Sequence, residues 1–158
     1  MAKPNTLDAL HEDDMEETLN AALEAAKSIT YKGFTFLDNS LNPAHWSFSE
    51  INGEAKRIGA ALQAYGLVKG DRLALVLTSP EDFVLSFLGA VAAGVMPVPM
   101  YPPLALGRMD NYLERALGIL RVSGAKAILS TRDLMPIVEL TLNRAPNLKS
   151  MIDVETVR

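Results

Sequence analysis

The strongest hydrophobic pattern in the chain is an uninterrupted apolar run over residues 73–77. A run of this kind is typical of a parallel strand that is buried on both faces of a sheet. Ser79 can cap a helix over residues 80–93, whose first turn carries two acidic residues where the helix dipole favours them. Gly94 would end this helix, and residues 95–98 predict a second strand. A right-handed crossover would make the two strands parallel.

Amphipathic helices are predicted on either side of this strand–helix–strand unit. Ser47 and Glu50 have the spacing of a capping box and would begin a helix that ends at Gly66. A second helix is predicted over residues 109–123, and Gly124 would end it. Apolar residues at helical spacing mark the expected buried faces: Ile51, Ala55, Ile58, Leu62 and Tyr65 in the first helix, and Met109, Leu113, Ala116, Leu117 and Leu120 in the second.

Shorter patterns predict a hairpin and a helix near the beginning of the chain. Residues 30–37 are rich in β-branched and aromatic side chains and predict a strand. Residues 46–48 would join this strand as a hairpin across a turn at residues 38–43. Before the hairpin, an apolar stripe predicts a helix that starts at Thr6 or Asp8 and runs to about residue 26.

Two more strands are predicted at residues 126–130 and 150–154. Between them we expect a helix over residues 133–144, capped by Thr131. Strands that alternate with helices after an initial hairpin indicate an α/β fold with a layered, mostly parallel sheet and flanking helices.

Composition and charge narrow the possible functions. Of 158 residues, 49% are hydrophobic and 22% are charged, which favours a folded chain over a disordered one. The formal net charge is −4 and no cluster of Lys and Arg stands out along the sequence, so no nucleic-acid partner is expected. The absence of cysteine excludes disulfides and thiolate metal sites and fits a cytoplasmic protein, and the acidic beginning lacks the apolar core of a secretion signal.

The uncharged stretch over residues 83–107 is long enough to span a bilayer. Gly94 and several prolines interrupt it, and a lipid-exposed helix would lose backbone hydrogen bonds at those positions. We therefore expect a buried helix followed by a buried strand, and no transmembrane segment.

Few residues suggest catalytic or metal chemistry by themselves. Residues 11–14 (His-Glu-Asp-Asp) resemble a metal cluster in composition, but neighbouring residues of a helix point in different directions, so a solvated acidic face is expected. His45 is expected to be a loop histidine without a catalytic partner. The helix start at Ser79 could bind an anion, but no glycine-rich loop precedes it, and ordinary capping is expected.

Six short segments stand in a characteristic order and spacing. They are residues 34–38 (FTFLD), 46–50 (WSFSE), 60–63 (AALQ), 66–67 (GL), 70–72 (GDR) and 93–103 (AGVMPVPMYPP). Together they resemble the opening of the adenylate-forming ligases, over about Thr35 to Asp153. The Pro-Val-Pro-Met-Tyr-Pro-Pro ending resembles the fatty acyl-AMP ligase branch in particular, whose sister branch comprises the fatty acyl-CoA synthetases. The resemblance implies part of the N-terminal domain of the adenylate-forming ligase fold.

The resemblance also implies a reaction, its cofactors and its partners. Such a ligase converts a fatty acid and ATP into an acyl-adenylate and pyrophosphate, with the help of Mg²⁺. The acyl group would then pass to the thiol of an acyl carrier protein or of coenzyme A. ATP and Mg²⁺ are therefore the cofactors implied for the full-length enzyme.

The family motifs that carry the chemistry are not matched in this sequence. No segment matches the Ser/Thr/Gly-rich phosphate loop, Tyr65-Gly66 lacks the Thr-Glu that would complete an adenylate-binding segment, and the catalytic lysine has no counterpart. Residues 107–110 (Gly-Arg-Met-Asp) match a hinge motif, but they stand far too early in the chain order to serve as one. We therefore expect no catalytic residue, no metal site and no bound cofactor here, and a fragment that is inactive alone.

Met100, Tyr101 and Pro102 are the candidate binding residues. They follow the second predicted strand, and ligands of such sheets tend to lie beyond the carboxyl ends of strands. The resemblance implies that these residues line the wall of an acyl tunnel. The alternative is that they only fix a rigid turn between strand and helix.

We expect residues 1–29 to form a leader and helix, and residues 30–158 to form the first, incomplete subdomain of an AMP-binding domain. A parallel sheet that lacks part of its cover exposes apolar surface or a strand edge, so a homodimer of the fragment is expected. Two other hypotheses stay open at this point: a free-standing, non-catalytic α/β binding or interaction module, and a ligase for an amino or aryl acid.

Overall fold

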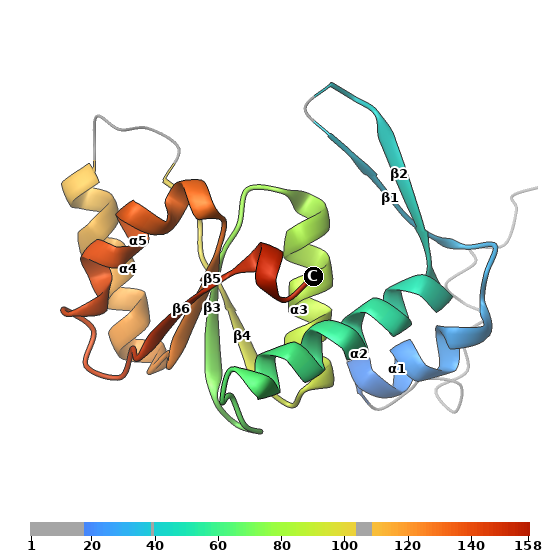
Figure 1. Ribbon diagram of the computed structural model, residues 1–158, viewed down its shortest axis with the longest axis horizontal. Helices are drawn as coiled ribbons and strands as arrows, with labels where there is room; N and C mark the ends of the chain where they lie inside the picture. Colours follow the sequence, from blue (N-terminus) through green and yellow to red (C-terminus); the bar gives the residue numbers. More distant parts are fainter. Residues whose placement is uncertain (1–17, 39, 104–108) are drawn as a thin grey trace, which may run out of the picture.

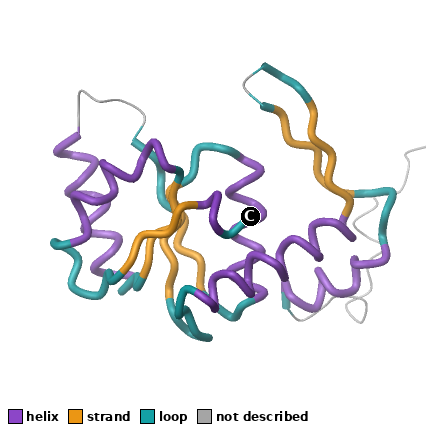
Figure 2. The backbone as a smooth tube through the Cα atoms, in the orientation of Figure 1, coloured by secondary structure: helices purple, strands orange, loops and turns teal. Residues whose placement is uncertain are grey.

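A four-stranded parallel sheet, with strand order β4-β3-β5-β6, forms the centre of the molecule (Figures 1 and 2). The computed structural model describes residues 18–38, 40–103 and 109–158. The strands are β3 (Arg72–Val76), β4 (Met96–Pro99), β5 (Ala127–Ser130) and β6 (Ser150–Asp153). The predicted α/β class with a layered parallel sheet is confirmed.

Each face of the sheet is covered by a different pair of helices. They are α2 (Phe48–Ala64) and α3 (Pro80–Ala92) on one face, and α4 (Met109–Ser123) and α5 (Met135–Leu142) on the other. Alternate residues of a strand point to opposite faces, so Leu73 and Leu75 pack in the first layer and Ala74 and Val76 in the second. Because these residues are all buried, the predicted burial of this strand on both faces is confirmed.

Local signals set the helix boundaries as predicted. The hydroxyl of Ser47 accepts a hydrogen bond from the backbone N–H of Glu50, and the Glu50 carboxylate accepts one from the N–H of Ser47, so a capping box begins α2. The hydroxyl of Ser79 accepts from the N–H of Asp82 at 3.3 Å and begins α3. After α3, Gly94 adopts a φ of 71°, in the left-handed region that favours glycine.

The helix α1 (Leu19–Ala25) lies within the range predicted for the first helix. The backbone of Thr18 is extended, and its hydroxyl accepts a hydrogen bond from the N–H of Ala21 at 3.1 Å, so Thr18 caps the helix. The predicted starts at Thr6 and Asp8 and the acidic run at residues 11–14 lie outside the described residues. A short 3₁₀ turn, η3 (Ala26–Ser28), follows α1.

The predicted hairpin is confirmed, and it consists of β1 (Gly33–Leu37) and β2 (Pro43–Ser47). The two strands are antiparallel, and the hairpin extends away from the main sheet (Figure 1). The interpretation of His45 as a loop residue is wrong, because His45 lies in β2 opposite Thr35. Its Nδ1 lies 3.0 Å from the hydroxyl oxygen of Thr35.

Two predictions at helix ends are also wrong. Thr131 makes no side-chain capping bond, because a 3₁₀ turn, η5 (Arg132–Leu134), separates it from α5. Tyr65 is 48% exposed instead of buried, because α2 ends before it. Its hydroxyl donates to that of Thr156 at 2.8 Å, in the 3₁₀ turn η6 (Val154–Thr156).

The strand β4 lies at an edge of the sheet and its residues are exposed or half-buried, so the expectation of a buried second strand is wrong. The N–H of Met96 donates to the carbonyl of Asp71, and the N–H of Met100 donates to that of Leu75 in β3. The backbone nitrogens of the alternate residues Pro97 and Pro99 therefore face the outer edge of the sheet. Proline has no N–H to offer there, so this edge is a poor template for another strand. Pairing of two copies through β4 is disfavoured, and the homodimer stays a prediction.

Within the described part of the chain, no helix has both the length and the apolar character needed to cross a membrane. The uncharged stretch singled out in the sequence contains most of α3 and the whole of β4.

Close packing between α2 and α3 gives a test of the fold. A Cβ atom at Gly89 would lie 2.4 Å from Cγ2 of Ile58, so the helices would have to move apart. We expect Gly89→Ala to lower the free energy of unfolding by about 1–3 kcal/mol in urea titrations. Gly118→Ala is the matched control, because nothing lies within 4 Å of a Cβ there. Gly118→Ala should raise the free energy of unfolding by up to about 1 kcal/mol. Similar effects of the two substitutions would contradict close packing between α2 and α3 at Gly89.

Candidate functional site

An apolar pocket of about 370 Å³ lies at the carboxyl edge of the sheet, where β3 and β4 end. Its lining residues are Leu77, Phe83, Pro99, Met100, Tyr101 and Pro102. The structure therefore brings the three predicted binding residues together in one apolar pocket. Met100 is 7% exposed and belongs to the floor, whereas Tyr101 is 84% exposed and belongs to the rim. Their role in acyl binding stays a prediction.

Strand pairing explains the position of the pocket. Leu75 and Pro99 are register partners in the parallel pair β3–β4, and the N–H of Met100 donates to the carbonyl of Leu75 at 2.9 Å. Leu77 and the residues after Pro99 therefore leave the sheet at the same edge. Phe83, in the first turn of α3, adds an aromatic ring from the neighbouring helix. Ligands of parallel sheets are commonly bound at this edge.

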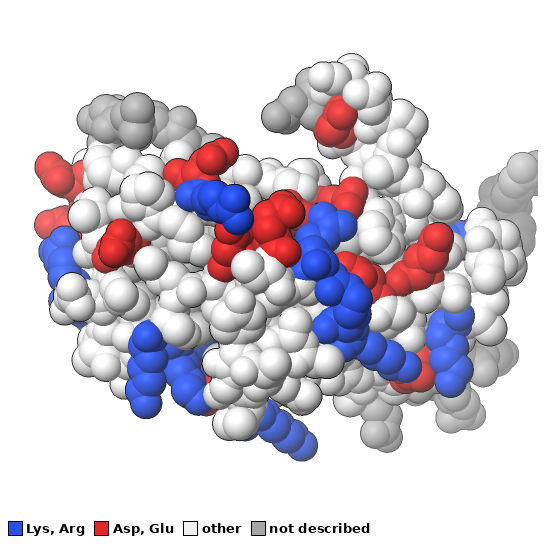
Figure 3. Space-filling view, in the orientation of Figure 1, with Lys and Arg blue, Asp and Glu red and all other residues white. Residues whose placement is uncertain are grey.

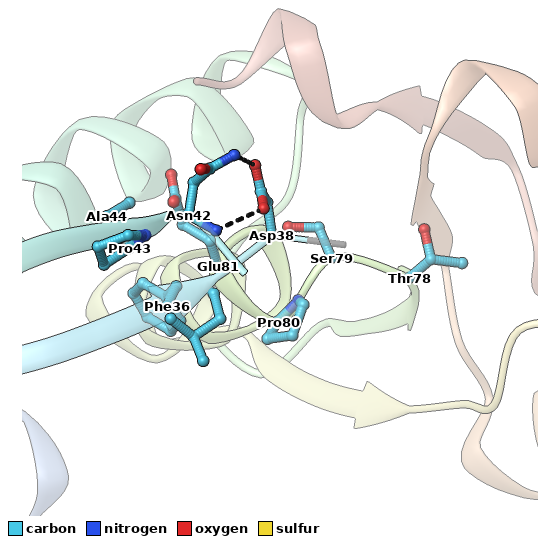
Figure 4. Close-up of a pocket in the computed structure, with 10 residues that line it drawn as sticks. Phe36, Asp38, Asn42, Pro43, Ala44, Thr78, Ser79, Pro80 and Glu81 are labelled. Carbon is cyan, nitrogen blue, oxygen red and sulfur yellow. Dashed lines mark hydrogen bonds between the residues drawn. The ribbon is translucent and has the colours of Figure 1, made fainter. Parts of the chain in front are cut away.

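A second, more polar pocket of about 360 Å³ lies between the hairpin and the start of α3 (Figure 4). The hairpin contributes Phe36, Leu37, Asp38, Asn42, Pro43 and Ala44, and the start of α3 contributes Thr78, Ser79, Pro80 and Glu81. The Asp38 carboxylate accepts hydrogen bonds from the side-chain amide of Asn42 and from the N–H groups of Asn42 and Ser40. These bonds, the one from the Asn42 side chain first among them, hold the pKa of Asp38 below its ordinary value, so the carboxylate stays charged at lower pH than an ordinary aspartate.

A charged cluster around Arg158 borders this polar pocket. The Arg158 guanidinium donates to Glu81 at 2.5 Å and to Asp82, lies 3.9 Å from Glu54, and sits over the ring of Trp46. Burial lowers the pKa of Arg158, but its bonds to Glu81 and Asp82 raise it more, so the pKa is raised overall. The cluster holds β2, α2 and the start of α3 together.

The described residues do not fit ATP and Mg²⁺ by themselves. In residues 18–38, 40–103 and 109–158, no three His, Asp or Glu side chains gather in a way that could hold a metal ion. The start of α3 borders both pockets, and the Arg158 guanidinium beside it is already paired with Glu81 and Asp82, so it is not free to bind phosphates. The arrangement suits the binding of an apolar group beside a fixed polar wall.

Sequence reasoning missed the polar pocket and the Arg158 cluster. The sequence predicts the turn between Asp38 and Asn42. The approach of this turn to Thr78 and Glu81 depends on how the hairpin is placed beside the start of α3. The groups around Arg158 come from separate elements, so no local spacing signals the cluster. Capping by Ser79, by contrast, was predicted and is confirmed.

Comparison with known proteins identifies relatives for most of the chain. The profile of the AMP-binding enzyme family matches residues 26–158. A 4-hydroxybenzoate–CoA/benzoate–CoA ligase of Rhodopseudomonas palustris is 28% identical over 68% of this chain and 19% of its own length. The long-chain-fatty-acid–AMP ligase FadD26 of Mycobacterium marinum is 36% identical over 62% of this chain and 17% of its own length.

A solved structure of a ligase has a similar fold over most of this chain. The crystal structure of a fatty acid AMP ligase from Legionella pneumophila matches 87% of this chain and 23% of its own, with a TM-score of 0.68 and 28% identity. The chain spans between 14% and 23% of the length of the curated relatives that it matches.

Replacing Arg158 tests the charged cluster. Arg158→Gln would leave Glu81 and Asp82 without their cationic partner, so we expect the free energy of unfolding to fall by about 1–3 kcal/mol. The control is Arg132→Gln, which removes a 3.0 Å ion pair with Asp153 in which the arginine side chain is 78% exposed. That change should cost less than about 1 kcal/mol. Equal losses in urea titrations of the two variants would mean that the cluster has no special role.

Proposed function

Because the chain belongs to the AMP-binding enzyme family, we propose that it forms the N-terminal part of an ATP-dependent fatty acid adenylating ligase. The full-length enzyme would convert a fatty acid and ATP into acyl-AMP and pyrophosphate. It would then pass the acyl group to the thiol of an acyl carrier protein or of coenzyme A. In this proposal residues 1–29 form a leader and helix, residues 30–158 form the first part of the large domain, and the enzyme acts in the cytoplasm.

The apolar pocket at the carboxyl edge is the observation that carries the choice of a fatty acid. Leu77 and Phe83 meet Met100, Tyr101 and Pro102 there, so the lining side chains are mainly aliphatic and aromatic. A hydrocarbon chain gains free energy from such a surface by leaving water. The relative FadD26 is named as a long-chain-fatty-acid–AMP ligase, which supports the same substrate class.

An aryl acid is the competing substrate. The relative from Rhodopseudomonas palustris is named for 4-hydroxybenzoate and benzoate, and Phe83 and Tyr101 would also suit a ring. A substrate panel with the full-length enzyme separates the two possibilities, because a pocket for a hydrocarbon chain should favour longer fatty acids over benzoate.

In this proposal, the chain supplies a wall of the binding site and structural support, while the reactive groups lie in other segments of the full-length enzyme. The phosphate loop and the catalytic lysine of such ligases have no counterpart in this sequence. The 158-residue chain is therefore expected to be inactive alone. Fatty-acid-dependent exchange between ATP and pyrophosphate should be absent from this chain and present in the full-length enzyme. Exchange by the chain alone would contradict the proposal that the reactive groups lie in other segments.

Replacing Tyr101 tests the acyl wall. In the full-length enzyme, Tyr101→Ala should lower kcat/KM for a long-chain fatty acid about tenfold, through lost apolar contact, with a smaller effect on a short-chain acid. Tyr31→Ala is the matched control, because Tyr31 is similarly exposed, at 78%, and lies outside the pocket. A uniform loss for both chain lengths, or an equal loss in the control, would exclude Tyr101 from the acyl site.

A further inference from the structure

Basic residues that are scattered along the sequence meet at the edge of the sheet where the strands begin. We call this surface the basic edge, and it consists of Lys69, Arg72, Arg121, Lys126, Arg144 and Lys149. The strands start at the lower rim of the molecule in Figure 1, and Figure 3 shows blue basic atoms gathered along that rim with little red among them. All six residues except Lys126 are exposed.

Three of these residues form a row across adjacent strands. The N–H of Lys126 donates to the carbonyl of Arg72 at 2.9 Å, and the N–H of Lys149 donates to the carbonyl of Lys126 at 2.8 Å. Neighbouring strands lie about 4.8 Å apart, and like charges at facing positions of a sheet are destabilising. The row therefore carries an electrostatic cost in the folded chain.

Asp71 offsets only part of this repulsion. Its carboxylate lies 2.6 Å from Nζ of Lys126, and this bond, followed by that from the N–H of Val68, lowers the pKa of Asp71. Among the described residues, no carboxylate lies within ion-pair distance of Arg72 or Lys149. Two exposed cations of the row are thus left to interact with something else.

Helix dipoles explain some of the basic edge but not the row. Arg121 lies in the last turn of α4, and Arg144 follows α5, so both are favoured by the negative ends of helices. Arg72 and Lys149 stand at strand starts, where no comparable dipole stabilises them. Their position is therefore better explained by an anionic partner.

Exposed apolar side chains accompany these cations. Val68 precedes Lys69, Val122 follows Arg121, and Met96 is the register partner of Arg72. Val122 is 92% exposed, Val68 60% and Met96 45%. Cations mixed with exposed apolar side chains are typical of surfaces that bind lipid headgroups and the acyl boundary beneath them. A purely acidic protein surface would pair with the cations but would not bury these apolar side chains.

We propose that the basic edge binds the surface of a bilayer that contains anionic phospholipids. The chain as a whole has a net charge of −4, so the attraction is local and turns this edge toward the membrane. The carboxyl edge with its two pockets lies at the other end of the strands and stays accessible. This inference concerns a different surface from the proposed acyl site and does not depend on it.

Vesicle sedimentation tests the proposal with the 158-residue chain. We expect binding to vesicles of phosphatidylcholine mixed with phosphatidylglycerol, and not to vesicles of phosphatidylcholine alone. High salt should weaken the binding, because the Debye length falls to about 3 Å at 1 M. The double variant Arg72→Gln, Lys149→Gln should bind mixed vesicles at least about tenfold more weakly. Val122→Ser should weaken the binding that remains at high salt.

The matched control is Lys32→Gln with Arg115→Gln, which removes the same charge from exposed positions outside the basic edge. It should bind nearly as well as the unchanged chain, and circular dichroism should show that all variants are folded. Equal binding to both kinds of vesicle, or equal weakening by the control pair, would overturn the proposal. Binding to soluble polyglutamate but not to mixed vesicles would also overturn it and would assign the surface to an acidic protein.

Discussion

The structure depends on the burial of the two central strands, β3 and β5, between two apolar layers. Each strand presents alternate residues to the α2/α3 layer and to the α4/α5 layer, so the burial of both faces requires both layers. The buried hydroxyl of Ser130 does not disturb this arrangement, because it donates to the carbonyl of Val76 at 2.8 Å. The remaining elements take their positions from this pair of strands.

Parallel strands also give the molecule two chemically different edges. The four strands of the parallel sheet end at the edge where the apolar pocket forms and where α3 starts with Glu81 and Asp82 in its first turn. The same four strands begin at the opposite edge, where Arg72, Lys126 and Lys149 stand in register. The same topology that places a binding wall at one end therefore gathers positive charge at the other, which the dispersed lysines and arginines of the sequence do not reveal.

The predictable part of the fold rests on local chemistry. The capping box of Ser47 and Glu50 and the left-handed Gly94 are set by neighbouring residues, so the sequence alone locates them. His45 and Thr131 were misassigned because their roles depend on strand pairing and on an intervening 3₁₀ turn. These features carry no periodic signal of their own.

The candidate site, like the fold, has features that the sequence predicts and features that depend on tertiary contacts. Met100, Tyr101 and Pro102 could be placed beyond a strand end from the sequence, whereas their meeting with Phe83 depends on how α3 packs on the sheet. The Arg158 cluster depends on contacts of the segment after η6 with β2, α2 and α3, and no spacing along the chain predicts it.

Amide hydrogen exchange tests the central role of the buried strand pair most directly. Protection reports the free energy needed to open each segment, and the most protected amides belong to the core that opens last. Burial between two layers predicts the slowest exchange in β3 and β5, at residues such as Leu75 and Leu129, and much faster exchange in the hairpin β1–β2. Hairpin amides as protected as those of β3 would contradict it.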